Sequence, residues 1–184
     1  MKFIGTKNLE TERLILRRLT VSDATDAYNN WCNDDDVCRY VVWEKHKDVN
    51  ETIELFKMWE EAYKKDNTYR WIVVIKESNE PIGTIDVCKI LFDGCEIGYC
   101  YSKKSWGKGY GTEALKAVIK FLFEECDAYI VYADYMSLNP ASGRVMDKAG
   151  MKYDGTLRDR AISKDGIRSD LIYKSLTKNE YFNK

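Results

Sequence analysis

The spacing of apolar and polar residues divides the chain into amphipathic stretches and short β-patterned ones. Apolar residues that recur every three or four positions predict helices. These helices run from a cap at Thr20 or Ser22 to about Trp31, from about Val49 to Lys65, and from Thr112 onward. The third stretch has one broad apolar face, formed by Ala114, Leu115, Val118, Ile119, Leu122 and Phe123.

Runs rich in β-branched and aromatic residues predict strands at 13–17, 71–75, 82–90, 96–101 and 129–133. Turn-forming residues at 78–81 and 92–94 join the second, third and fourth of these into an antiparallel meander. A short helix follows, with Asn139 as N-cap, Pro140 as its first residue and Gly150 just past its end. Near the end of the chain, Lys-Asp-Gly at 164–166 predicts a hairpin between two strands.

This order of elements predicts an α+β fold, a mixed and mostly antiparallel sheet with helices on its faces. The chain has 184 residues, only two prolines and no low-complexity run, so we expect one domain spanning 1–184. Its 29 basic residues nearly balance its 30 acidic ones, which argues against nucleic acid as a partner. No membrane span or signal peptide is evident, so we expect a cytoplasmic protein.

The six cysteines and the single histidine are not spaced as metal ligands, and we predict no metal site. The cysteines are expected to be reduced structural thiols. His46 lies in a run of charged residues and is expected to be solvated.

The strongest chemical signal is Ser-Trp-Gly-Lys-Gly-Tyr-Gly-Thr at 105–112, between the meander and the third helix. Alternate glycines let backbone N–H groups approach an anion closely. A helix start adds unpaired N–H groups and partial positive charge, so the segment predicts a pyrophosphate site. A Walker A loop or a Rossmann fingerprint would need a different glycine spacing. A glycine-rich connection without a ligand remains an alternative.

This segment resembles motif A of the GNAT superfamily, Gln/Arg-x-x-Gly-x-Gly/Ala. Trp106 stands at the Gln/Arg position, and Gly109 and Gly111 stand at the two glycine positions. Tryptophan there is typical of the RimJ/RimL-like branch. Residues 139–151 are similar to the second signature of that branch, Asn-x-x-Ser-x-x-Val-x-x-Lys-x-Gly-Phe. The resemblance extends from about residue 9 to residue 177.

The resemblance implies an acetyl-CoA-dependent N-acetyltransferase that passes the acetyl group directly to a primary amine. In this family two neighbouring strands splay into a V-shaped gap that holds the pantetheine arm, here strands 96–102 and 129–133. The residues implied to bind acetyl-CoA are Cys100, Tyr101, Ser102, Gly107, Lys108, Gly109, Tyr110, Gly111, Thr112, Asn139 and Lys148.

By the same resemblance, Glu96 is the candidate base and Ser142 the candidate acid toward the leaving thiolate. Both have ordinary alternatives: Glu96 as an exposed strand residue, and Ser142 as a solvent-facing residue in the first turn of a helix that Asn139 caps. Lys148 is equally well explained as a solvated lysine. Gly143 inside a helix costs about 1 kcal/mol relative to alanine, which indicates that another group approaches closely.

The partners implied are acetyl-CoA and an amine, either a peptide N-terminus or a small cationic amine such as a polyamine or an aminoglycoside. The acidic run at 34–36 would attract a cation or cap a helix. The alternatives to an acetyltransferase are a non-catalytic acyl-CoA-binding module and a nucleotide-binding protein. The chain is expected to be a monomer or a homodimer.

Overall fold

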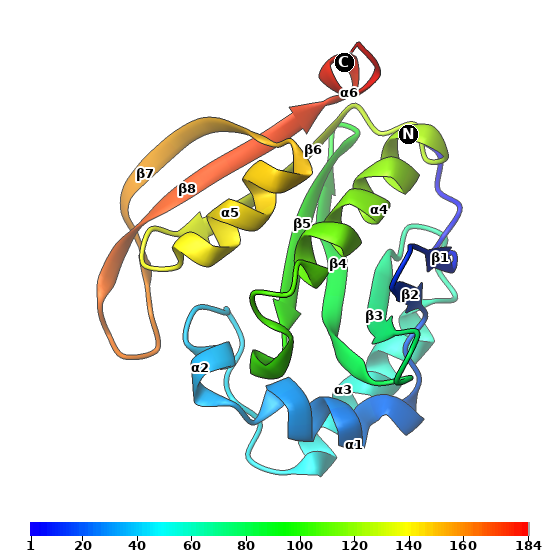
Figure 1. The fold of residues 1–184 in the computed structure, drawn as a ribbon, viewed down its shortest axis with the longest axis vertical. Helices are drawn as coiled ribbons and strands as arrows, with labels where there is room; N and C mark the ends of the chain where they lie inside the picture. Colours follow the sequence, from blue (N-terminus) through cyan, green and yellow to red (C-terminus); the bar gives the residue numbers. More distant parts are fainter. Residues whose placement is uncertain (184) are drawn as a thin grey trace.

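The computed structural model describes residues 1–183 and is built around a single eight-stranded sheet (Figure 1). The strands lie in the order β1-β2-β3-β4-β5-β6-β8-β7. Every neighbouring pair is antiparallel except β5 and β6, which are parallel. The expected α+β fold with a mixed, mostly antiparallel sheet is therefore confirmed.

The strands are β1 (Leu9–Glu10), β2 (Leu14–Arg17), β3 (Arg70–Ile75), β4 (Pro81–Leu91), β5 (Gly94–Tyr101), β6 (Ile130–Met136), β7 (Lys152–Ile162) and β8 (Arg168–Thr177). The helical elements are η1 (Val21–Asp23), α1 (Ala24–Ala27), the π-helical η2 (Tyr28–Cys32), α2 (Asp35–Cys38), α3 (Val49–Ala62), η3 (Lys103–Ser105), α4 (Tyr110–Glu124), α5 (Pro140–Ala149) and α6 (Lys178–Phe182).

Most predicted elements are present, with shifted ends. In place of the first predicted helix, the structure has three successive helical elements of different pitch, η1, α1 and η2, which begin after Thr20. The second ends at Ala62 rather than Lys65. Two short helices, α2 and α6, were not predicted. The acidic run contains the start of α2, since the Asp34 side chain accepts hydrogen bonds from the N–H groups of Asp36 and Val37.

Two apolar cores lie on opposite faces of the sheet. Helices α4 and α5 cover one face, where α4 buries Leu115, Val118 and Leu122. Helices α1 and α3 cover the other face, where Trp31 and Phe56 are buried. Successive side chains of a strand point to opposite faces, so each core takes alternate residues of the sheet.

His46 does not match its predicted exposure and is buried. Its backbone N–H donates to the Cys32 carbonyl, which folds the segment after α2 back against the protein. Its Nδ1 lies 2.7 Å from the Thr52 hydroxyl of α3. Burial lowers the pKa of this imidazole. The expectation of a solvated histidine was wrong because Thr52, one turn into α3, supplies a polar partner inside the core.

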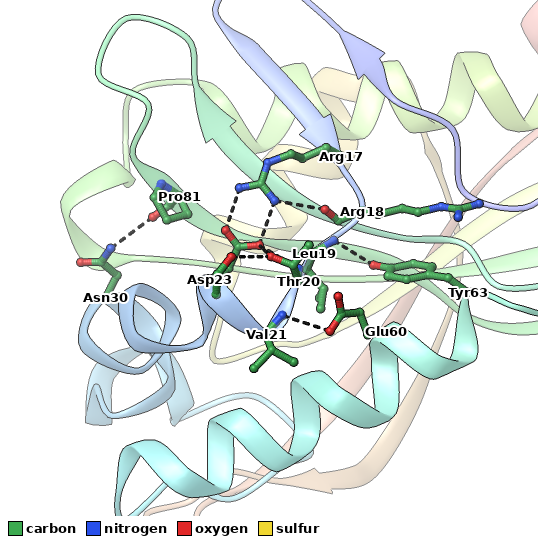
Figure 2. Close-up of polar contacts among 11 residues, drawn as sticks. Arg17, Arg18, Leu19, Thr20, Val21, Asp23, Asn30, Glu60, Tyr63 and Pro81 are labelled. Atoms are coloured by element: carbon green, nitrogen blue, oxygen red, sulfur yellow. Dashed lines mark hydrogen bonds and ion pairs between the residues drawn. The ribbon is translucent and has the colours of Figure 1, made fainter.

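A polar network fixes the start of η1 against the sheet (Figure 2). The Arg17 guanidinium donates to both carboxylate oxygens of Asp23, at 2.7 and 2.8 Å. Asp23 also accepts from the Thr20 N–H at 2.8 Å. Burial opposes the charge on Asp23, but the bonds from Arg17 and Thr20 outweigh it and lower the pKa of this carboxyl.

We predict that Asp23→Asn lowers the free energy of unfolding by about 1–3 kcal/mol, because Arg17 and the Thr20 N–H lose a charged acceptor. Urea denaturation measures this cost. The pKa of Asp23 is lowered by folding, so its contribution is present at neutral pH and shrinks as the pH falls below about 4. The exposed Asp26→Asn in α1 is the matched control; an equal cost in both variants would contradict the prediction.

Candidate active site

The central feature of the site is a gap between β5 and β6. The two strands pair in parallel only at Gly94 with Ile130, Cys95 with Val131 and Glu96 with Tyr132. Beyond that point β5 continues to Tyr101 and β6 to Met136 without pairing with each other. Their facing backbone groups are left available to an added extended chain.

The turn that follows β5 leaves several backbone N–H groups unpaired. Gly107 and Gly109 have φ angles of 74° and 84°, the left-handed region that favours glycine. The first hydrogen bond of α4 runs from the Glu113 N–H to the Gly109 carbonyl, so the N–H groups of residues 110–112 have no helical partner. Open space surrounds Gly107, where an added Cβ would meet nothing within 4 Å. The turn therefore presents a free, partly positive helix start.

The N-terminal segment braces this turn. The Glu113 carboxylate accepts from the Thr11 hydroxyl at 2.6 Å and from the Arg13 N–H at 2.9 Å. The Arg13 guanidinium also bonds Glu113 and donates to the Lys108 carbonyl at 3.0 Å. Burial would raise the pKa of Glu113, but these hydrogen bonds lower it. The brace holds the first turn of α4 from outside the sequence motif.

Two side chains at the end of β5 have buried hydroxyls without partners in the described part of the chain, the Tyr101 hydroxyl and Ser102 Oγ. An unsatisfied buried hydroxyl costs about 1–3 kcal/mol, so its presence calls for an explanation. The Tyr101 ring lies 3.1 Å from the place that a Cβ on Gly111 would take, directly against the start of α4. These hydroxyls therefore lie at the junction of the gap and the turn.

Cys100 faces the opposite layer and packs beside the α1–α3 core. Its Sγ is 3.5 Å from the Thr84 hydroxyl of β4, and burial raises the pKa of the thiol to about 11. A neutral thiol is a poor nucleophile, so its side chain serves as part of the wall.

Helix α5 places its first turn beside β5. The Asn139 side chain accepts from the Ser142 N–H at 3.4 Å, as an N-cap does. Ser142 Oγ lies 2.9 Å from the Tyr99 hydroxyl of β5, which also donates to the Ser142 carbonyl at 3.2 Å. Ser142 is therefore half-buried and directed at β5, whereas a purely solvent-facing serine would have no such partner.

The packing of α5 explains its internal glycine. A Cβ on Gly143 would lie 2.5 Å from the Tyr135 ring of β6, so the predicted close approach is that of a strand side chain. The buried Lys174 of β8 donates to the Gly143 carbonyl at 3.4 Å and to Asp147 at 2.5 Å. Sequence patterning missed Lys174, and the only available signal is a lysine directly after the apolar run 171–173.

Glu96 is half-buried at the point where the strands diverge. By alternation its side chain lies on the face away from α4, as does that of Tyr132, its neighbour on β6. Asp134 follows two residues later on the same face of β6. Burial, and then the negative charge of Glu96, raise the pKa of Asp134 to about 6. Sequence analysis missed Asp134, although an acidic residue inside an apolar strand was a usable signal.

The other predicted residues are more scattered. Lys148 is exposed in the last turn of α5 and forms no hydrogen bond or ion pair with another residue of 1–183. The acidic run is engaged internally: Asp35 pairs with Lys45, and Asp36 pairs with Lys103 just before the turn.

Within residues 1–183 no helix is long and apolar enough to cross a bilayer. The same residues include no group of three side chains suited to hold a metal ion.

The comparisons with known proteins agree with this geometry. The family model described as the acetyltransferase (GNAT) domain matches residues 13–152. An uncharacterized N-acetyltransferase, p20 of Bacillus licheniformis, is 29% identical over 177 residues, 95% of this chain and 98% of that protein. The [ribosomal protein uS5]-alanine N-acetyltransferase of Escherichia coli is 27% identical over 123 residues, 65% of this chain and 63% of that protein.

Solved structures share the fold. The ribosomal-protein-S5-alanine acetyltransferase of Vibrio fischeri superimposes with a TM-score of 0.83 at 20% identity, covering 95% of this chain and 98% of that one. The ribosomal L7/L12 α-N-protein acetyltransferase RimL, solved with coenzyme A, gives a TM-score of 0.82 at 14% identity and covers 95% and 99%. With the motif, the splayed strands and the family match in agreement, this chain belongs to the GNAT family of N-acetyltransferases.

Proposed function

We propose that the protein transfers the acetyl group of acetyl-CoA to the α-amine at the N-terminus of a protein or peptide. The observation that carries the proposal is the early end of β5–β6 pairing, followed directly by a free helix start. An elongated ligand with a pyrophosphate at one end fits both features.

The residues present fit acetyl-CoA. The N–H groups and glycines of 107–112 are proposed to hold the pyrophosphate, with Lys108 and Lys148 adding positive charge. The backbone of 100–102, the unpartnered hydroxyls of Tyr101 and Ser102, and the Asn139 side chain are proposed to hold the pantetheine arm. Acetyl-CoA supplies a thioester whose carbonyl carbon accepts the amine.

Only a neutral amine is nucleophilic, so the site must remove a proton. At pH 7 this costs about 1 kcal/mol for an α-amine and about 4.6 kcal/mol for a lysine side chain. The lower cost supports an N-terminal acceptor, as does the name of the uS5-alanine relative. Glu96 is the proposed base of the site, acting directly or through water. Ser142, bonded to the Tyr99 hydroxyl, is the proposed acid toward the sulfur.

The proposal is tested by measuring thiol release from acetyl-CoA with a panel of acceptors: N-terminal peptides, lysine peptides, polyamines and aminoglycosides. We expect the highest kcat/KM with an N-terminal peptide. A polyamine or an aminoglycoside as the best acceptor would overturn the choice of amine. Binding of acetyl-CoA without turnover of any acceptor would favour an acyl-CoA-binding module.

We predict that Glu96→Gln and Ser142→Ala each lower kcat at least tenfold, because each removes a proton-transfer group. The Kd for acetyl-CoA should stay unchanged, since neither residue belongs to the phosphate turn. Steady-state kinetics and calorimetry measure the two quantities. Glu77→Gln, exposed in the β3–β4 turn, is the matched control for Glu96. Unchanged kcat in both active-site variants would remove these role assignments.

We predict that Arg13→Met raises the Kd for acetyl-CoA about 3–10-fold, because the Lys108 carbonyl and Glu113 lose their donors and the turn is less well ordered. Calorimetry on the folded variant measures this. Arg168→Met, exposed at the start of β8, is the control. An equal change in both variants would mean that the brace does not support binding.

A further inference from the structure

Asp134 is placed where a proton acceptor for the amine would be needed. It lies on β6 two residues past Tyr132, the last residue paired with β5, and thus on the β6 side of the gap. Alternation places its side chain on the same face as Tyr132, and Tyr132 pairs with Glu96. Asp134 is half-buried, and its carboxylate accepts no hydrogen bond and pairs with no cation within residues 1–183. No internal partner therefore occupies the Asp134 carboxylate, which leaves it available to accept a proton.

The groups around Asp134 are acidic or phenolic. After burial, the negative charge of Glu96 on β5 is the second cause that raises the pKa of Asp134. The charge of Asp134 in turn adds to the effect of burial on the pKa of Tyr99 on β5 and of Tyr173, its pairing partner on β8. The guanidinium of Arg160 on β7 acts on Tyr173. Asp134 thus interacts electrostatically with acidic and phenolic groups on β5 and β8, and no cation of residues 1–183 pairs with it.

Resting on the proposed function, we propose that Asp134 is a further catalytic residue, whose carboxylate takes up the proton that Glu96 removes from the acceptor ammonium. The two carboxylates then act in sequence. Glu96 accepts the proton of the amine, directly or through water, and Asp134 takes it up from Glu96. Burial, and then the negative charge of Glu96, make Asp134 more basic than an ordinary aspartate. Asp134 remains mostly ionised at pH 7, since its pKa is raised only to about 6.

The protons and electron pairs balance. The ammonium gives one proton to Glu96, which passes it to Asp134, and the nitrogen lone pair forms the C–N bond to the acetyl carbon. The C–S bond breaks and its electron pair stays on sulfur. The second nitrogen proton reaches that sulfur by way of Ser142, and Asp134 returns its proton to water. The products are the acetylated amine, free CoA and one released proton.

The pKa of the acceptor amine affects this proton transfer, whichever carboxylate takes the proton. An α-amine has a pKa of about 8, roughly two pH units above that of Asp134, whereas a lysine amine at about 10.4 lies more than four above it. Proton transfer from lysine is therefore less favourable by a factor of more than a hundred. This chemistry selects N-terminal α-amines without needing a specific pocket.

The first test is the pH dependence of kcat with acetyl-CoA and an alanine-terminated peptide. Wild-type kcat should fall as the pH drops through about 6, because protonated Asp134 cannot accept a proton. Asp134→Asn should lower kcat about a hundredfold and lose this fall. Glu96→Gln should move the midpoint to lower pH, since it removes the charge that raises the pKa. Asp66→Asn, exposed between α3 and β3, should match wild type.

The second test needs no substrate. Folding raises the pKa of Asp134 above its unfolded value of about 3.9, so its stabilising effect is present below pH 4 and is lost as the pH rises through about 6. At pH 8 the folded state carries a half-buried charge without a cationic partner. Asp134→Asn should therefore have a higher Tm than wild type at pH 8, and the difference should shrink toward pH 4.

The outcomes of these tests distinguish the catalytic role of Asp134 from the proposed acetyltransferase function. If wild type acetylates the peptide and Asp134→Asn keeps its kcat and pH profile, the role of Asp134 is overturned and the proposed function stands. If Asp134→Asn has a lower Tm than wild type at pH 8, the carboxylate is a structural partner and the proposal is likewise overturned. If wild type releases no CoA with any acceptor, both claims are overturned.

Discussion

The rest of the site depends on one constraint, the divergence of the parallel strands β5 and β6. They separate after Glu96 and Tyr132, the last of their three pairs. Hydrogen bonding between β5 and β6 ends at Glu96 and Tyr132, so each strand carries unpaired backbone into the interior of the sheet. Unpaired backbone polar groups are costly unless a partner arrives. The gap is therefore a preformed site for an extended ligand. The residues at its narrow end, Glu96 and Tyr132, lie next to the group that such a ligand carries into the gap.

Several contacts made by residues outside the family motifs keep the two sides of the gap in position, some of them with residues of the motifs. On the β6 side, Lys174 and the Tyr135 ring fit α5 against the sheet, and the Tyr99–Ser142 hydrogen bond ties α5 to β5. On the β5 side, the Arg13–Glu113 brace fixes the first turn of α4. Rigid elements on both sides reduce the ordering that binding would otherwise require.

Local patterns predicted those features that depend on local physics. The glycine spacing at 107–111 predicted a glycine turn at a helix start, and in that turn Gly107 and Gly109 adopt left-handed backbone. Asn139, Pro140 and Gly150 predicted α5, because capping chemistry is local. Most strands were predicted by their β-branched runs, with ends displaced by a few residues.

Features that depend on tertiary contacts could not be predicted from one sequence. His46 is buried because its backbone N–H donates a hydrogen bond to the Cys32 carbonyl, which holds its segment against the protein. Lys174 and Asp134 are charged residues next to apolar runs, but only the sheet order shows that one lies under α5 and the other beside Glu96. The roles of Glu96 and Ser142 stay predictions that kinetics must test.

The most direct test of the account is amide hydrogen exchange with and without coenzyme A. We predict new protection at those N–H groups of residues 97–101 that do not pair with β4, and at the turn 107–112, with β1 to β3 unchanged. Protection confined to other segments, or none at saturating coenzyme A, would contradict the claim that the gap and the free helix start form one binding site.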